Sequence, residues 1–341
     1  MTEPVVVNVY DQTGAVSQKG FGVAMIFDPS NTNPLEEVTS TDEISNWTSG
    51  DLAYEKANAI LSQEPKPTKV MLYGVDIATE GTTIADELDD LVTQNNDWYA
   101  LDIASRTEAD ITAAADWVAS KEKIMFGQLD IATTPSEIET YMGSKENQNF
   151  ALFAHDGGVA SEEQYFDSGA LGVLLPMSPG SYTMKFKTVN NVAGSTFKPG
   201  ENSTIIDANA NTYVEDLGEN YIAEGVMSNG EFLDNTVVKH WFAARYREEI
   251  FRRLKVNKKI PFDDVGIAQI VAAVKKVNKV AANNGVVAQD VDGNFLMSVT
   301  YPRRRDILEN DLANRVLKGV ESTVVYSGAI HNVELDFVLT L

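Results

Sequence analysis

The sequence predicts a mixed α/β (α+β) protein of two domains, with a strand-like apolar run near each of its two ends. Strands and helices alternate between residues 69 and 154, an order that favours parallel strands covered by helices. The alternation breaks at the Pro- and Gly-containing stretch 176–180, where we expect a second domain to begin. A length of 341 residues suits two or three domains of ordinary size.

Periodicity and turn residues place the elements of the first domain. Residues 21–27 predict a buried strand, the stretch 28–34 predicts a loop, and near-helical spacing of apolar residues predicts a helix over 51–62. The alternating series that follows consists of strands at 69–75, 98–103, 124–129 and 150–154 and of helices at 84–92, 108–119 and 135–141.

The second domain is predicted to contain longer helices. It opens with a strand at 182–189 and a polar, turn-rich stretch at 190–211. Asp292-Gly293 predicts a hairpin turn, because this dipeptide tolerates positive φ angles. The other predicted elements are helices at about 236–254 and 266–282, hairpin strands at 285–289 and 295–300, a helix at 306–318, a strand at 323–326 and an alternating apolar run at 333–339.

Composition excludes several classes of protein. The chain has no cysteine, so disulfides, thiol nucleophiles and thiolate metal sites are absent. A net charge of −23 opposes direct binding to nucleic acid or to anionic membranes. No apolar run approaches the roughly 20 residues of a membrane helix, and Glu3 and Pro4 lie where a signal peptide would carry positive charge. We therefore expect no membrane insertion and expect synthesis in a cytoplasm.

The charge is unevenly distributed along the chain. Residues 1–238 hold 11 Lys and Arg against 38 Asp and Glu, whereas residues 239–341 hold 16 against 12. The first part therefore carries −27 and the last part +4. Such a division favours one acidic, solvated face and another face that can meet an acidic partner.

No pattern predicts a catalytic residue, a cofactor site or a metal site. Gly20 and Gly22 lack the third glycine of a dinucleotide loop, because Met25 stands in its place, and no Walker-type phosphate loop occurs. The acidic stretch 290–294 has the wrong spacing for a calcium loop and is better interpreted as a turn. Asp86, Glu87, Asp89 and Asp90 suit a solvated helix face better than paired catalytic carboxylates. The histidines are widely spaced and are interpreted as structural or surface residues: His155, His240 and His331.

Two basic helices each allow two interpretations. Residues 239–255 carry a stripe of Lys and Arg that would suit phosphate contact, but Glu248 and Glu249 lie four residues before Arg252 and Arg253, in the order that favours pairing along a helix. The helix at 266–282 has one apolar face, with lysines away from it: Lys275, Lys276 and Lys279. These lysines belong either to a solvated face or to a docking surface for an acidic partner.

The apolar runs near the two ends have a local and an intermolecular interpretation. Most strands at chain ends pair within their own domain. The long polar spacer at 11–20, however, would let the first run reach the open sheet edge of a neighbour and add a strand to it. The residues concerned are Val5, Val6, Val7 and Val9 in the first run and Leu335, Phe337, Val338 and Leu339 in the last.

The order of several motifs resembles the tail sheath family of contractile phages and of phage-like (R-type) bacteriocins. A short acidic turn at 39–44, a Tyr-bearing helix at 53–57 and the Pro-rich exit at 63–67 follow the family's pattern. Later come Asn211-Thr212-Tyr213, the stretch 230–234 before the long helix with its Trp241, Lys259-Ile260-Pro261-Phe262-Asp263-Asp264-Val265-Gly266-Ile267, and Ser327-Gly328-Ala329-Ile330-His331-Asn332-Val333-Glu334-Leu335.

This resemblance implies a non-enzymatic structural subunit without cofactors. It implies hexameric rings stacked as a helix around a tail tube protein, with baseplate and tail terminator proteins as further partners, in a phage virion or a bacteriocin particle. The two arms would complete sheets in adjacent subunits, and contraction would drive the tube through a cell envelope. The implied organisation is an N-terminal arm and linker at 1–20, an outer α/β domain at 21–180, an inner α+β domain facing the tube at 181–332 and a C-terminal arm at 333–341. On this interpretation Lys275, Lys276 and Lys279 contact the tube.

Two other classes remain open at this point. A soluble α/β enzyme or ligand-binding protein would carry its site on loops at strand ends. A nucleic-acid-binding protein would use the basic helix and would show salt-sensitive DNA retention.

Overall fold

The computed structural model describes residues 18–339, which form two compact units. The large unit consists of Gly20–Trp241 and the segment from Gly328 onward, and the small unit consists of Phe242–Ser327 with the described residues before Gly20. Both units contain helices and strands, which confirms the mixed α/β class. In the described part of the chain, no helix is long and apolar enough to cross a membrane.

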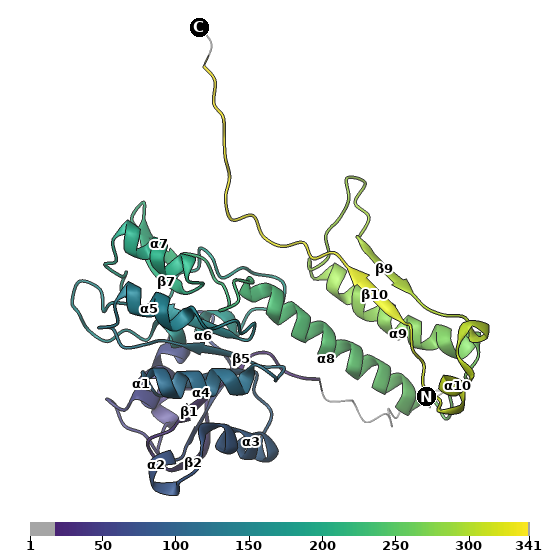
Figure 1. The fold of residues 1–341 in the computed structure, drawn as a ribbon, viewed down its shortest axis with the longest axis horizontal. Helices are drawn as coiled ribbons and strands as arrows, with labels where there is room; N and C mark the ends of the chain where they lie inside the picture. The colour runs from purple at the N-terminus through teal and green to yellow at the C-terminus, as the bar shows by residue number, and fades with distance from the viewer. Residues whose placement is uncertain (1–17, 340–341) are drawn as a thin grey trace, which may run out of the picture. The chain divides into compact units, whose positions relative to one another are not determined.

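One eight-stranded sheet forms the centre of the large unit, in the order β2-β3-β1-β4-β5-β6-β7-β8 (Figure 1). The six strands from β3 to β7 in this order run parallel, and β2 and β8 pair antiparallel at the two edges. Their bounds are β1 Val23–Asp28, β2 Asn33–Val38, β3 Lys69–Gly74, β4 Ala100–Ile103, β5 Ile124–Gly127, β6 Phe150–Ala154, β7 Asn211–Asp216 and β8 Glu219–Ile222.

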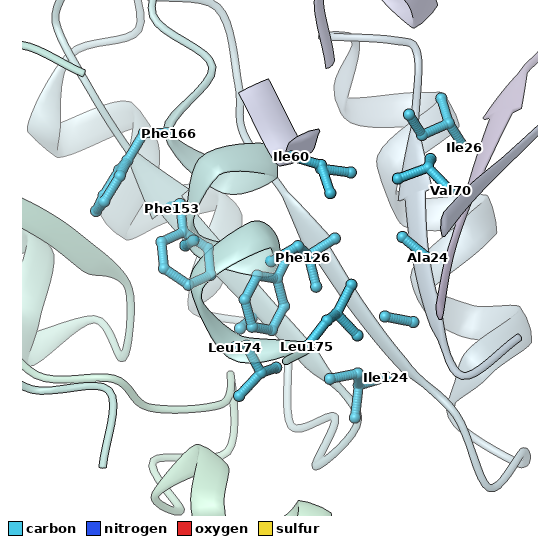
Figure 2. Close-up of a cluster of buried hydrophobic side chains, with 14 of the residues drawn as sticks. Ala24, Ile26, Ile60, Val70, Ile124, Phe126, Phe153, Phe166, Leu174 and Leu175 are labelled. Atoms are coloured by element: carbon cyan, nitrogen blue, oxygen red, sulfur yellow. The ribbon is translucent and has the colours of Figure 1, made fainter. Parts of the chain in front are cut away.

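The central strands are buried on both faces, because alternate side chains enter two separate hydrophobic cores. In β1, Ala24 and Ile26 belong to one core and Met25 and Phe27 to the other. Figure 2 shows part of the first core, in which Ile60 and Phe166 meet side chains from the strands. Both faces of the sheet must therefore be covered by helices.

Helices cover each face of the sheet. Residues of α1 and α6 belong to the first core, and residues of α3, α4, α5 and α7 belong to the second. Thr83, Thr107 and Thr134 cap the helices that follow them, and Thr134 forms a full capping box with Glu137. The helix bounds are η1 Thr41–Glu43, α1 Leu52–Leu61, α2 Ile77–Glu80, α3 Ile84–Gln94, α4 Glu108–Val118, α5 Pro135–Met142, α6 Phe166–Leu174 and α7 Pro199–Asp207.

The alternating strands and helices predicted between 69 and 154 are all present. The predicted strand at 182–189 is wrong. Its apolar residues Tyr182, Met184 and Val189 are buried, but the left-handed backbone of Phe186 (φ 69°) interrupts the extended conformation. The polar edge strand β2 and the elements α6, α7, β7 and β8 were not predicted, because their sequences are short or lack clear periodicity.

The small unit begins within the long helix α8, Leu233–Val256, of which the residues from Phe242 onward belong to it. A second helix, α9, contacts both α8 and a two-stranded sheet, since Asn278 bonds to Tyr246 and to Ser322. Gly266 is required near its start, because a Cβ there would lie 1.7 Å from the carbonyl oxygen of Pro261. The other elements are α9 Asp264–Asn283, β9 Met297–Thr300, η2 Arg304–Asp306, α10 Glu309–Ala313 and β10 Glu321–Val324.

Two predictions for the small unit need correction. The turn at Asp290–Gly293 forms, with Gln289 bridging Phe295, but β9 pairs with β10 and not with residues 285–289. The predicted helix at 306–318 contains only the short α10, and Arg315 (φ 57°) follows in the left-handed conformation. The apolar run at 333–339 belongs to the large unit and has no strand partner among the described residues, and its pairing with a neighbouring subunit stays a prediction.

The compact units have different bounds from the domains expected from the sequence. The expected boundary was at 180/181, whereas the large unit extends to Trp241. The reason is that β7 and β8 complete the large sheet and therefore pack with the elements before them. The assignment of an outer and an inner domain concerns an assembly of many subunits, and it stays a prediction.

Candidate functional site: surfaces for subunit contacts

The segment after β10 exposes a row of apolar side chains. Residues 328–339 contain no helix or strand. The predicted arm residues Leu335, Phe337, Val338 and Leu339 are between 74% and 84% exposed. The predicted residues of the first arm, Val5, Val6, Val7 and Val9, lie outside the described residues. So many exposed apolar side chains in an extended segment are typical of a contact with another chain.

The β9–β10 sheet of the small unit has open edges. Residues 297–300 of β9 pair with residues 321–324 of β10, and neither strand has a second strand partner within residues 18–339. Helix α9 supports the sheet through contacts with β9 and through the bond from Asn278 to Ser322. An edge of this kind presents unpaired backbone groups to which a further strand can bond.

The three predicted lysines lie on the exposed side of α9. Lys275, Lys276 and Lys279 are all exposed, while Val274 and Val277 face the interior. Lys276 Nζ lies 3.0 Å from Glu249 Oε2 on α8, whereas Lys275 and Lys279 form no ion pair with any described residue. Lys276 is thus already used within the small unit, and the other two lysines are available to a partner.

The basic helix pairs with its own acidic residues. Arg245 Nη1 lies 2.5 Å from Glu248 Oε2, and Arg252 pairs with Glu249. Both pairs have a spacing of three residues, where the sequence suggested four. This pairing favours the structural interpretation of the basic stripe over phosphate contact.

A groove of about 620 Å³ in the small unit is lined mainly by apolar side chains. Lys259 and Arg315 are its charged members, and no carboxylate or histidine is among the described residues that line it. Acid–base catalysis requires titratable groups brought together in a pocket. The groove offers no such set. Its apolar members are Leu254, Ile260, Pro261, Phe262, Ile267, Ile270, Leu312 and Leu317.

The large unit contains a buried ionic cluster that the sequence did not reveal. Lys56 Nζ on α1 lies 2.7 Å from Asp102 Oδ1 on β4 and 2.5 Å from Asp167 Oδ2 on α6, and all three side chains are fully buried. Ser168 Oγ donates to Asp102 Oδ2 at 2.6 Å, and Arg106 Nη1 lies 3.1 Å from Asp167 Oδ2. The cluster ties two helices to the sheet.

The charge states within the cluster follow from its geometry. Burial by itself would raise the pKa of Asp167, but Arg106 and Lys56 outweigh it and lower this pKa to about 2. Burial raises the pKa of Asp102, which Lys56 offsets only in part. Asp167 is therefore ionised, with both Arg106 and Lys56 as partners, and Lys56 also contacts Asp102.

The three histidines occupy separate places and have separate partners. His155 Nε2 lies 2.7 Å from the carbonyl oxygen of Ala193, and burial lowers its pKa. His240 Nδ1 lies 2.9 Å from the hydroxyl of Tyr99, and His331 Nε2 lies 2.8 Å from Thr183 Oγ1. Within residues 18–339, no group of His, Asp and Glu side chains is arranged to hold a metal ion.

A family model matches a part of the chain that includes α9 and β9 of the small unit. Residues 233–306 match the E217 tail sheath protein gp31-like, C-terminal domain. The match begins at the first residue of α8 and continues through α9 and β9 to η2. No curated protein matches the chain by sequence.

Solved structures share the fold over the full chain. The contracted helical sheath of the anti-feeding prophage has 11% sequence identity and a TM-score of 0.71, with 99% of each chain covered. A chain in the six-fold symmetrised baseplate of the same prophage has 12% identity, a TM-score of 0.68 and 100% coverage of both chains. The contracted PVC sheath complex, from an extracellular contractile injection system, has 10% identity and a TM-score of 0.69, covering 99% of this chain and 98% of that one.

These similarities agree with the resemblance found in the sequence and with a structural, non-enzymatic protein. Residues 233–306 are similar to the tail sheath C-terminal domain family, and the whole chain has the fold of the sheath proteins of contractile injection systems.

Proposed function

We propose that this chain is the sheath subunit of a contractile particle and polymerises by exchanging strands with its neighbours. The observation that carries this proposal is the pairing of a donor and an acceptor in one chain. Within the described residues, the exposed apolar segment Leu335–Leu339 has no strand partner, and neither β9 nor β10 has a second strand partner. The segment needs a sheet edge to which its backbone can bond, and the sheet edge can accept a further strand.

Strand addition would satisfy both features at once. In an extended segment, Val333, Leu335, Phe337 and Leu339 point to one face, and Glu334 and Asp336 point to the other. Four to six backbone hydrogen bonds contribute about 4–6 kcal/mol before ordering costs. Each Leu or Phe that becomes fully buried adds about 1.5–3 kcal/mol. One arm is a weak connection, and a lattice of many arms is a strong one.

The assembly that follows from this exchange is a helical stack of six-membered rings around a tail tube. The six-fold baseplate that contains a chain of the same fold supports the ring size and a baseplate partner. The contracted sheaths of the same fold support contraction as such. On this proposal the subunits rotate as bodies during contraction while the strand connections hold. On this proposal the chain occurs in a phage virion or bacteriocin particle after assembly in the host cytoplasm, and a tail terminator protein ends the stack.

The tube is expected to contact the exposed side of α9. The +4 charge of residues 239–341 and the unpaired Lys275 and Lys279 suit an acidic tube surface. Exposed ion pairs contribute up to about 1 kcal/mol each. Contacts of this strength hold an extended sheath when repeated many times, and they release easily on contraction.

Reversing lysines of α9 to glutamate is expected to weaken assembly on tubes while leaving the subunit folded. Lys275→Glu with Lys279→Glu is the cleaner variant, because Lys276→Glu also breaks the pair with Glu249. Co-sedimentation with preformed tubes at several salt concentrations measures the effect. Lys258→Glu, an exposed lysine outside α9, is the matched control. Unchanged tube binding by the double variant would remove α9 from the interface.

Electron microscopy of the purified chain separates the proposed function from a soluble enzyme or binding protein. We expect long tubes or rings from the intact chain, whereas an enzyme of this fold would form a small compact oligomer. A chain that lacks residues 1–10 is expected to lose these assemblies, because the first arm is removed. If the shortened chain polymerised and contracted like the intact one, the first arm would have no role in assembly.

A further inference from the structure

His331 is exceptional in the segment that follows the small unit. In the stretch 327–339, it is the one residue that is not exposed. Its neighbour Ile330 is 82% exposed and Val333 is 81% exposed. The segment therefore has a single point of attachment to the large unit among these residues.

Three residues of the large unit form the notch that receives His331. Thr183 Oγ1 lies 2.8 Å from His331 Nε2. The ring of Phe232 meets the imidazole edge to face, with 4.7 Å between centroids and an interplanar angle of 85°. Phe186 lies on a further side at 6.4 Å, also at 85°. We call Thr183, Phe186 and Phe232 the His331 notch.

The left-handed backbone conformation of Phe186 supports a structural role for this notch. Its φ of 69° lies in the left-handed region, which has a conformational cost for an L-residue with a large side chain. Burial does not account for this cost, since the side chain is 50% exposed. The ring instead packs against Tyr221 in a tilted arrangement, with 5.5 Å between centroids, and meets the imidazole of His331 edge to face. The strained conformation thus builds one wall of the notch.

We infer that the His331 notch fixes the root of the C-terminal strand and so sets where a neighbouring subunit is reached. This inference rests on the proposed strand exchange for its biological role. From a fixed His331, the eight residues to Leu339 extend at most about 26–29 Å, whereas twelve residues from Ser327 would extend about 40–43 Å. A shorter tether with a fixed root confines the strand to a smaller volume and raises its effective concentration at the acceptor edge.

The absence of cysteine from the chain allows a direct distance measurement. We call the attachment of His331 to its notch the pin. Spin labels are attached at Asn332→Cys, next to the pin, and at Ser203→Cys, an exposed position on α7 of the large unit. The labelled full-length chain is diluted into an excess of unlabelled chain, so that pulsed electron resonance detects only distances within one subunit. The expected result is one narrow distance distribution.

Removing the pin is expected to broaden this distribution. In His331→Ala the flexible tether before the label grows from one residue to five, and its spread grows as the square root of length, which gives about a twofold increase in width. Phe186→Gly removes one wall of the notch and is expected to broaden the distribution as well. Ile330→Ala, a neighbouring exposed position, is the matched control and is expected to leave the width unchanged.

The outcomes distinguish the pin from the proposed function. Equal widths in the His331→Ala and parent chains would overturn the pin. A broadened distribution in His331→Ala supports it whether or not the chain forms tubes, because the dilution removes any dependence on assembly. If the pin holds and the chain never forms tubes, the strand-exchange proposal fails on its own.

Discussion

Replacing Lys56 with methionine is expected to destabilise the large unit by about 3–5 kcal/mol, the cost of removing one partner from a buried ion pair. Lys56 is fully buried between Asp102 and Asp167. Methionine fills a similar volume but leaves the two carboxylates facing each other. Asp167 still has Arg106 as a partner, with Arg106 Nη1 3.1 Å from Asp167 Oδ2. Asp102 therefore loses more electrostatic stabilisation than Asp167. For a unit of this size, the melting temperature is expected to fall by about 6–20 °C.

Tryptophan fluorescence during urea unfolding measures this effect in the large unit alone. All four tryptophans lie within it: Trp47, Trp98, Trp117 and Trp241. Lys198→Met is the matched control, since its side chain is 82% exposed, and we expect a change within about 0.5 kcal/mol. Adding Asp102→Leu to Lys56→Met is expected to recover part of the loss by removing the unpaired charge. An unchanged unfolding midpoint in Lys56→Met would contradict the assigned role of the cluster.

The same cluster is expected to stabilise the large unit less as the pH falls into the acid range. Arg106 and Lys56 lower the pKa of Asp167 to about 2, below the ordinary value of 3.8. A carboxylate with a lowered pKa stabilises the fold above its unfolded pKa, and this contribution is lost as the pH falls through the folded pKa. The stabilisation from Asp167 is therefore complete above about pH 4 and disappears as the pH falls towards 2.

Placing aspartate at Leu335 and Phe337 is expected to abolish polymerisation. In a strand these two side chains share a face, which must become buried when the segment adds to a neighbour's sheet. A charge on that face costs more than the arm contributes. Sedimentation and electron microscopy are expected to detect only unassembled subunits. The melting temperature is expected to stay unchanged, because both residues are exposed within the subunit.

The opposite face of the same segment provides the control. Glu334→Ser with Asp336→Ser also alters two positions, but these side chains face away from the buried side in an extended strand. Assembly by this variant is expected to be close to normal. Tubes from Leu335→Asp with Phe337→Asp at normal yield would show that the C-terminal segment does not form the connection.

The spacing of apolar residues was sufficient to predict those helices and strands whose conformation depends on residues nearby in the sequence. The strands and helices between 69 and 154 were predictable, because their apolar periodicity reflects burial on a regular sheet. The strand predicted at 182–189 was wrong, although its apolar residues are buried, because a single left-handed residue at Phe186 redirects the backbone. A hydrophobic pattern records which residues are buried, and it does not record every backbone turn between them.

The mixed α/β class, the acidic and basic parts, the absence of thiol chemistry and the apolar run at 333–339 follow from the amino-acid sequence. Three other features are visible only in the folded chain: β7 and β8 complete the large sheet, Lys56 meets carboxylates 46 and 111 residues away, and His331 is held in a notch. Composition and periodicity depend on local spacing, whereas these contacts join residues that only the folded chain brings together. The terminal strand belongs to both groups: its apolar pattern is visible in the sequence, and its exposure becomes visible only in the fold.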